Sequence, residues 1–257
     1  MPFTLSHAVV AAPLHYMSGQ RLPLAALAIG AMSPDLHRLF TTSTSYVTHE
    51  WQSIFSVTLW IALGFCLLWY LLYRPFIYAC LGLSDALNIK NSRDFFVFIL
   101  LTSIAVVVGI ATHLIWDGLT HDDFRTFMLH DFLRSDVAIF NQSYPMHRVL
   151  QLASSVITLP FLIWLTLGYY QSHKNVTVPM KIKRYALRTV ILASCMGGIY
   201  TCLYLTQLSA SDWQAMLYYH SGRSINEFFQ GFLLIFTLST IVFLFFPKNR
   251  QSFDKKL

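Results

Sequence analysis

The sequence predicts an all-α fold: a polytopic transmembrane helical bundle with about five spans, plus an amphipathic or re-entrant helix near the N-terminus. Of the 257 residues, 55% are hydrophobic and only 12% are charged, whereas soluble domains carry about 25% charged residues. The hydrophobic residues are concentrated in runs of roughly 20, the length that crosses a bilayer as a helix. Lysines and arginines gather in short segments between these runs, as in multi-pass membrane proteins.

The chain is expected to form a single integral membrane domain with three parts. Residues 1–52 are a polar segment with candidate metal ligands, 53–246 contain the spans, and 247–257 are a basic cytoplasmic tail. Within the first part, Leu22–Met32 is apolar but too short to span, so we expect a core helix or a re-entrant segment there. The expected spans are Ser53–Tyr73, Phe95–Trp116, Leu150–Tyr170, Thr189–Leu208 and Phe228–Phe246.

The segments between the spans indicate how the bundle is oriented in the membrane. Arg74-Pro75 is expected to end the first span, and Asp117–Arg148 and Ser209–Asn226 read as polar loops. The segment Lys174–Arg188 and the tail are strongly basic, and the positive-inside rule places them on the cytoplasmic side of an inner membrane. The two polar loops and the N-terminal segment then lie outside. The net charge of +6 follows from this asymmetry and does not indicate a nucleic-acid partner.

Cysteine usage and the N-terminus exclude two other classes. The four cysteines form no Cys-x-x-Cys pair and are interpreted as small core residues, so we expect no disulfide. The N-terminus has no basic region before its apolar run, so we expect no cleavable signal peptide.

The stretch Thr112–His121, at the end of the second expected span, is the strongest functional signal. His113 and Asp117 are four residues apart, which places both side chains on one helical face where they can share a metal ion. His121 is one turn further, about 12 Å of helical rise from His113. Either Gly118 loosens the helix so that the chain wraps back, or His121 serves a second ion or supports the first ligands.

Other histidines cluster on the same expected membrane face. Nine of the ten fall at or beyond the outer face, and the first three spans each carry one there. Imidazole and carboxylate ligands suit zinc, and also manganese or iron. The candidate metal ligands are His7, Asp35, His37, His49, His113 and Asp117. The candidate catalytic residues are His121, as a further ligand or a general acid or base, and His147 and Arg148, which could bind a substrate phosphate.

Four segments of the sequence resemble a bacterial membrane family called domain of unknown function 4184. They are Pro2–His7, Gly30–Asp35, Thr48-His49 and Thr112–His121. The same positions are more distantly similar to inner-membrane metal-dependent hydrolases, whose pattern matches His7, Pro34-Asp35, Thr48-His49 and the pair His113 and Asp117. His37 stands where those hydrolases have a second aspartate, and Glu50 where they have a serine.

Three functions are compatible with these residues. The first is a metal-dependent hydrolase of an ester or phosphoester, with a lipid or its headgroup as a candidate substrate. The second is a non-catalytic protein that senses, stores or passes a metal ion, although the apolar spans argue against a conduction path. The third is a scaffold in which the polar residues only mark the border of the second span and stabilise the outer loops. In each case the bilayer is a partner, and the oligomeric state stays open.

Overall fold

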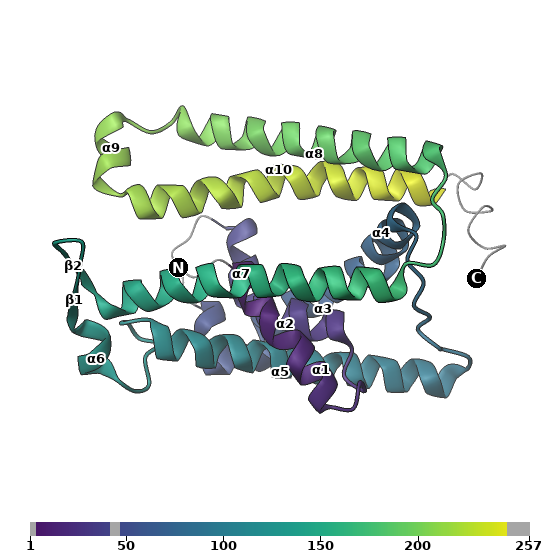
Figure 1. The fold of residues 1–257 in the computed structure, drawn as a ribbon, viewed down its shortest axis with the longest axis horizontal. Helices are drawn as coiled ribbons and strands as arrows, with labels where there is room; N and C mark the ends of the chain where they lie inside the picture. Colours follow the sequence, from purple (N-terminus) through teal and green to yellow (C-terminus); the bar gives the residue numbers. More distant parts are fainter. Residues whose placement is uncertain (1–3, 42–46, 246–257) are drawn as a thin grey trace. The chain divides into compact units, whose positions relative to one another are not determined.

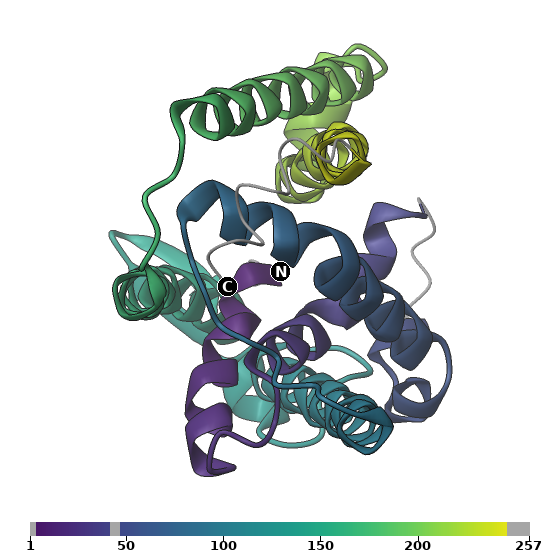
Figure 2. The ribbon, with the colours of Figure 1, turned by 90° about the vertical axis from the view of Figure 1, so that its right-hand side faces the viewer.

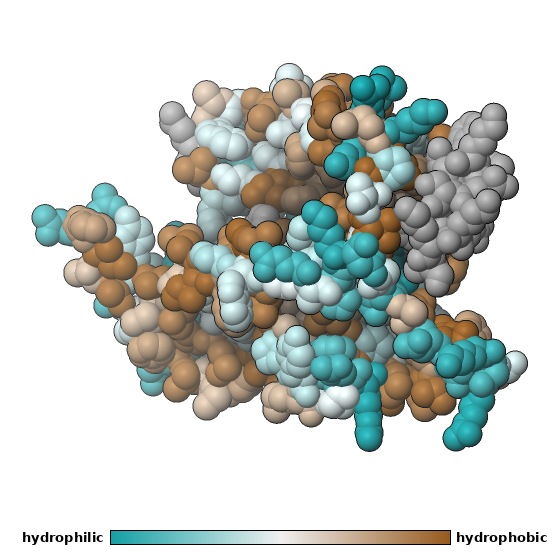
Figure 3. Space-filling model, turned by 45° about the vertical axis from the view of Figure 1, so that its right-hand side comes forward, coloured by the Kyte–Doolittle hydropathy of each residue, from teal (hydrophilic) through white to brown (hydrophobic). Residues whose placement is uncertain are grey.

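The computed structural model describes residues 4–41 and 47–245, and within them it is almost entirely helical. Five helical runs are long and apolar enough to cross a membrane, which confirms the predicted fold class. Large apolar side chains along these runs are exposed, and hydrophobic residues cover wide areas of the surface in Figure 3. Such a surface is suited to lipid. The five runs are Val57–Leu81, Ser92–Thr120, Met146–His173, Met180–Leu205 and Leu217–Phe245.

Short elements precede and connect these runs. The chain begins with a 3₁₀ helix, η1, followed by two helices that do not span, and a small hairpin lies between the second and third runs. The elements are η1 (Thr4–Val10), α1 (Ala11–Met17), α2 (Leu24–Leu36), η2 (His37–Leu39), η3 (Val47–His49), η4 (Trp51–Phe55), α3 (Val57–Leu68), η5 (Trp69–Tyr73), α4 (Arg74–Leu81), α5 (Ser92–Thr120), α6 (His130–Arg134), β1 (Asp136–Ile139), β2 (Gln142–Pro145), α7 (Met146–His173), α8 (Met180–Leu205), α9 (Ala210–Ala215) and α10 (Leu217–Phe245).

The chain folds as two compact units. The first takes in the chain up to His37, the segment that ends at Cys66, and Leu87–Tyr169. The second takes in Arg38–Thr41, Leu67–Ala86 and the chain from Tyr170 onward. The expectation of one membrane domain stays a prediction, and each unit is described by itself.

The first unit is built on the close packing of α2 against α5, which cross in Figures 1 and 2. A Cβ atom on Gly30 would lie 2.4 Å from the backbone oxygen of Val106, and one on Gly109 would lie 2.5 Å from that of Leu27. The two backbones therefore approach within a distance that only glycine permits. Ala26, Leu27 and Ala31 on α2 are fully buried. Of the two expectations for this segment, a core helix is the one that the structure favours.

The second unit is built on the antiparallel pair α8 and α10, which lie side by side in Figures 1 and 2 and are joined through α9. Glycines again allow the approach, because a Cβ on Gly231 would lie 2.6 Å from the backbone oxygen of Met196. At one end of this pair, Phe76 of α4 packs with Ile182 and Phe243 in a buried apolar cluster.

The helices are longer than the apolar runs predicted. The first span does not stop at Arg74-Pro75 but continues to Leu81, because a π-helical turn at η5 precedes Pro75 and the proline falls in the first turn of α4. The expected loop Ser209–Asn226 is also largely helical, since α10 begins at Leu217. Polar residues continue a helix in water as well as apolar ones do in lipid, so hydropathy marks the apolar centre of each helix and not its ends.

The expected loop Asp117–Arg148 contains regular structure that the sequence analysis missed. After α5 comes the short helix α6, and β1 then pairs with β2 in an antiparallel hairpin with Ile139 opposite Gln142. The two loop residues, Phe140 and Asn141, both have positive φ angles, 49° and 63°. Such a two-residue loop matches the twist of the two strands. The predicted tail, residues 247–257, lies outside the described residues.

Candidate metal centre

Six ionisable side chains from four separate segments of the first unit meet at the C-terminal end of α5. η1 supplies a histidine, the last turn of α2 an aspartate, η3 a second histidine, and the end of α5 the rest. All six are buried, with exposed fractions between 1% and 8%. They are His7, Asp35, His49, His113, Asp117 and His121.

The Asp117 carboxylate lies at the centre of this group. Its Oδ2 is 3.5 Å from Nε2 of His113 and 3.7 Å from Nε2 of His49. Its Oδ1 is 3.8 Å from Nε2 of His7 and 3.5 Å from Nδ1 of His121. One carboxylate therefore faces four imidazole rings, which is the donor set that a divalent transition metal prefers.

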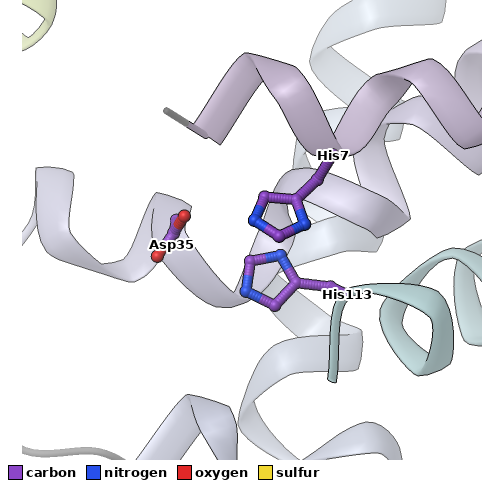
Figure 4. A group of neighbouring side chains, drawn as sticks. All are labelled: His7, Asp35 and His113. Carbon is purple, nitrogen blue, oxygen red and sulfur yellow. The ribbon is translucent and has the colours of Figure 1, made fainter. Parts of the chain in front are cut away.

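Asp35 adds a second carboxylate beside His7 and His49. Its Oδ1 lies 3.3 Å from Nε2 of His49, and its Oδ2 accepts a hydrogen bond from the Thr4 hydroxyl. Figure 4 shows the rings of His7 and His113 stacked, with centroids 4.0 Å apart, and Asp35 near them. Two sets of three residues have ligand atoms all within 4.8 Å of one another: His7, Asp35 and His113, and His49, His113 and Asp117.

The sequence Ser33-Pro34-Asp35 forms the last turn of α2 and not a separate turn. Pro34 has no N–H to donate to the carbonyl of Gly30, and the Ser33 hydroxyl donates to that oxygen instead, at 2.8 Å. The Thr48 hydroxyl then donates to the carbonyl of Pro34 at 2.9 Å. The first bond lies within α2, and the second ties the end of α2 to η3, so that Asp35 and His49 are held together.

Hydrogen bonds to the backbone also determine which ring nitrogen each histidine presents. Nδ1 of His113 lies 2.8 Å from the carbonyl oxygen of Ala31, which can only accept, so Nδ1 carries the proton. Nδ1 of His49 lies 3.2 Å from the Thr48 hydroxyl, whose own proton is committed to Pro34. His49 therefore donates from Nδ1 as well. In both rings the lone pair of Nε2 is left facing the centre of the group.

Several of these inward-facing atoms have no hydrogen-bond partner. They are both ring nitrogens of His7, Nε2 of His49, of His113 and of His121, and Oδ1 of Asp117. An unpaired polar atom in a protein interior costs about 1–3 kcal/mol, so such atoms are rare in a folded protein. A bound cation would satisfy the lone pairs among them, whereas neutral His7 also carries one N–H that needs an acceptor.

Burial keeps the histidines outside the helical spans uncharged. It lowers the pKa of His7 to about 3, and it lowers the pKa of His49 although Asp35 partly opposes the shift. Burial also lowers the pKa of His121 to about 4, against the attraction of Asp117. Neutral imidazole is the form that binds metals, so these rings need not lose a proton at neutral pH to become ligands.

Of the two alternatives for His121, a helix loosened at Gly118 is wrong, and a second ion or a supporting role stays a prediction. α5 is regular through Gly118 and ends at Thr120, after which His121 is extended, with φ −112° and ψ 151°. Its Nδ1 turns back to within 3.2 Å of the Asp117 carbonyl oxygen. Gly118 serves a different purpose: a Cβ there would lie 2.1 Å from the ring of Phe127, so the missing side chain makes room for the following loop.

That loop brings in Arg125, which the sequence analysis did not include in the site. Nη1 of Arg125 donates to Oδ2 of Asp117 at 2.7 Å, and its Nε donates to Oδ1 of Asp123 at 2.9 Å. The Thr126 hydroxyl donates to the carbonyl of His121. Oδ2 of Asp117 thus accepts from Arg125 while it also faces His113 and His49, and Oδ1 faces His7 and His121. A contact that depends on the chain reversing direction has no periodic signal in the sequence.

Three of the predicted residues do not join this group. His37 follows α2, is half-buried and lies in neither set of three. Nδ1 of His147 lies 3.2 Å from the carbonyl oxygen of Leu133, and Arg148 is exposed at the start of α7.

Comparison with known proteins identifies the family. No curated protein and no solved structure matches the chain. A family model, "Domain of unknown function (DUF4184)", matches residues 1–245 and so covers almost the whole chain. The chain with this buried group of histidines and aspartates belongs to the DUF4184 family.

Proposed function

We propose that this protein is a membrane-embedded, metal-dependent hydrolase that acts on an ester or phosphoester, with a lipid or its headgroup as the candidate substrate. The observation that carries the proposal is the convergence of four histidines and two aspartates in one buried group of side chains, here called the metal pocket, with several ligand atoms lacking partners. Helix packing alone does not require such a group, and burying it without a ligand is unfavourable.

The charge of the pocket supports a divalent cation. Three carboxylates lie at the pocket, those of Asp35, Asp117 and Asp123, and the one guanidinium that pairs with them is that of Arg125. Carboxylates therefore outnumber guanidinium groups in a largely buried region, and burial keeps His7, His49 and His121 uncharged. A divalent ion would balance the excess of carboxylates, and the imidazole and carboxylate donors favour zinc, with manganese or iron as alternatives.

The pocket is suited to one ion and not two. Both sets of three ligands include His113, and its Nδ1 is committed to the carbonyl of Ala31. Only Nε2 is left, and one ring nitrogen binds one ion. We therefore assign His113 and Asp117 as the central ligands, with His7, Asp35 and His49 around them.

The remaining residues have roles that the proposed chemistry would need. A bound divalent ion lowers the pKa of a coordinated water molecule, so that it can attack an ester or phosphoester at neutral pH. His121, neutral and with an unpartnered Nε2, can accept the proton of the attacking water. The proposed role of His147 and Arg148, binding a substrate phosphate, requires a substrate that extends from the pocket to the start of α7.

Two measurements test the proposal. Elemental analysis of the purified protein should find about one zinc, manganese or iron ion per chain, because Nε2 of His113 can bind only one. Asp117→Ala should lose this ion, whereas Glu227→Gln, which alters an acidic residue of the second unit that pairs with Arg223, should keep it. Generic phosphoesters and carboxylic esters should be hydrolysed by the wild type and not after chelation. An intact, metal-free wild type would refute the proposal.

A second function, a non-catalytic metal-binding protein, is favoured by the burial of every proposed ligand. Structural ion sites are closed, whereas catalytic sites keep a position open to substrate. If this function is the right one, the protein should contain the ion and be stabilised by it, yet show no chelator-sensitive turnover with any ester or phosphoester tested.

We further propose that the protein resides in a bacterial inner membrane with its C-terminus in the cytoplasm, so that the pocket lies at the outer face. The support is the concentration of basic residues after the first, third and fifth spans. In a chain without its four native cysteines, a cysteine at Ser211 should react with an impermeant thiol reagent in intact cells, and a cysteine at Ser172 should not. The reverse pattern would place the pocket at the cytoplasmic face.

A further inference from the structure

One buried group beside the pocket cannot be satisfied by a cation. The indole nitrogen of Trp116 is buried and has no hydrogen-bond partner. The unpartnered atoms of His49, His113, Asp117 and His121 can each offer a lone pair to a metal ion, and so can one nitrogen of neutral His7, whose other nitrogen is a donor. An indole nitrogen, in contrast, is only a donor, and it needs an acceptor such as an oxygen atom.

Trp116 lies next to the group of candidate metal ligands. It lies on α5 between His113 and Asp117, one turn from the first and adjacent to the second. The residue as a whole is half-buried, although its nitrogen is buried, so the N–H edge is turned inward. Its ring meets that of His7 edge to face, with centroids 5.8 Å apart and an interplanar angle of 69°.

The ordinary role of tryptophan at a membrane surface does not account for this arrangement. Interfacial tryptophans keep the N–H at the wet side, where water or headgroups accept from it. Trp60 and Trp164 are of that exposed kind, with 71% and 64% of their surface accessible. Among the tryptophans in the described part of the chain, Trp116 alone has a buried nitrogen without a partner.

We infer that Trp116 is a substrate-binding residue, whose indole N–H donates a hydrogen bond to an oxygen atom of an ester or oxyanion held beside the metal ion. The inference rests on the proposed metal site and deepens it. One cation would satisfy the unpartnered lone pairs, and one oxygen-bearing ligand would satisfy the unpartnered donor. An ester carbonyl and a phosphoryl group both supply such an oxygen, and inorganic phosphate is the simplest probe of that chemistry.

Trp116→Phe tests this role, because phenylalanine keeps an aromatic ring and removes the N–H together with the rest of the five-membered ring. The matched control is Trp164→Phe on α7, where the side chain is exposed. Full-length protein in detergent micelles, loaded with one equivalent of zinc, is titrated with inorganic phosphate and followed by calorimetry. Removing one hydrogen bond should weaken phosphate binding about tenfold in Trp116→Phe. Zinc affinity should stay within about twofold, and Trp164→Phe should behave as the wild type.

A second readout follows the N–H itself. In protein with ¹⁵N-labelled tryptophan, the indole resonance that is missing from Trp116→Phe should shift downfield on addition of phosphate, and that of Trp164 should not. This measurement is made with zinc and also without it.

The outcomes separate this inference from the metal proposal. Equal phosphate affinity of the wild type and Trp116→Phe overturns the role of Trp116, and so does a wild type that binds no phosphate. Loss of zinc in Trp116→Phe also overturns it, since the residue would then only shape the ion site. A wild type that binds no zinc refutes the metal site alone, and the resonance shift on adding phosphate without zinc still decides the role of Trp116.

Discussion

The molecule has two glycine-lined helix interfaces, one between α2 and α5 and one between α8 and α10. They pack in the same way, but the buried polar side chains near them differ in their hydrogen bonding. In both, glycines let two helix backbones approach closely: Gly30 and Gly109 in the first, Gly197 and Gly231 in the second. In both, a histidine is buried near one end of the helix pair, His113 in the first and His220 in the second. The packing principle is therefore shared.

The difference lies in hydrogen bonding. His220 shares a hydrogen bond of 2.7 Å with the Tyr204 hydroxyl, and nearby Arg223 pairs with Glu227. His113 has one hydrogen bond too, from Nδ1 to the carbonyl of Ala31, but its Nε2 is buried without a partner. In the described part of the chain, every buried side-chain nitrogen or oxygen that lacks a partner belongs to the first unit. The second unit shows that this sequence can satisfy its polar groups, so the unpartnered atoms grouped around Asp117 are best explained by a ligand; the unpartnered hydroxyl of Thr102, earlier on α5, is not part of that group.

The largest difference between the units is expected for metal content. His113→Ala should lower the affinity for zinc at least about 100-fold, because it removes the one ring that belongs to both ligand sets. His220→Ala should leave zinc binding unchanged. Metal-to-protein ratios after gel filtration report both results.

Non-additivity checks that His113 and Asp117 act together. The double variant with His113→Ala and Asp117→Ala should bind zinc little worse than either single variant, since neither residue holds the ion without the other. Two small effects that simply add would mean that these side chains only mark the polar end of α5.

Alanine substitutions at the two glycine-lined helix interfaces should lower stability by similar amounts but differ in their effect on zinc binding. Gly30→Ala and Gly231→Ala each place a Cβ within 2.4–2.6 Å of a backbone oxygen, so each should destabilise the protein by about 1–3 kcal/mol. Only Gly30→Ala should also weaken zinc binding, because α2 carries Asp35 and the carbonyl that orients His113. Gly168→Ala, where a Cβ meets nothing within 4 Å, is the control. Thermal unfolding and zinc titration measure the two effects, and equal zinc affinity in all three variants would contradict the comparison.

Lysine substitutions of Arg125 in the first unit and Arg223 in the second should differ less strongly in their effect on zinc affinity. Arg125→Lys should weaken zinc binding about tenfold, because lysine cannot bridge Asp117 and Asp123 as a guanidinium does, and supporting residues of this kind typically have effects of that size. Arg223→Lys, at the ion pair of the second unit, should not change zinc binding. Competition with a zinc-sensitive dye is accurate enough to separate the two, and a similar loss in both variants would point to a general effect of arginine.

The smallest expected effect is the pH dependence of the metal-free protein. His7 has a pKa near 3 when folded and 6.5 as the reference for an unfolded chain. As the pH falls below 6.5, the unfolded chain takes up a proton that the folded chain excludes, so stability is lost by up to about 1.4 kcal/mol per pH unit. Above pH 6.5 this contribution is complete. Chelated wild type should therefore unfold more easily at pH 5.5 than at pH 7.5, and His7→Gln should show a shallower dependence. Parallel curves would mean that His7 takes up its proton in the folded state.

The sequence by itself determined the number of membrane spans and the nature of the candidate ligands. Hydrophobic runs report spans directly, because a bilayer requires a minimum apolar length. The pairing of His113 with Asp117 was also predictable, since a separation of four residues places two side chains on one helical face whatever surrounds the helix.

The sequence predicted His37 as a ligand because it is close to Asp35 in the chain. The local helix geometry explains why Asp35 lies in the buried group and His37 does not. Residues two apart on a helix point to different sides, and α2 extends through Asp35 to Leu36. The helical end of α2 therefore directs Asp35 toward His49 and leaves His37 elsewhere. The sequence pattern was compatible with a turn, in which both side chains could have served one site.

Only the tertiary structure decided which distant residues meet and which atoms they present. His113 is oriented by Ala31, 82 residues earlier in the chain, and Asp117 is held by Arg125 across a reversal of direction. The inward N–H of Trp116 depends on the ring of His7 beside it. Helical period and hydropathy are local properties. The protonated nitrogen of a histidine, by contrast, depends on the acceptor that packing brings to it, and close packing of α2 on α5 through Gly30 and Gly109 is what brings that acceptor here.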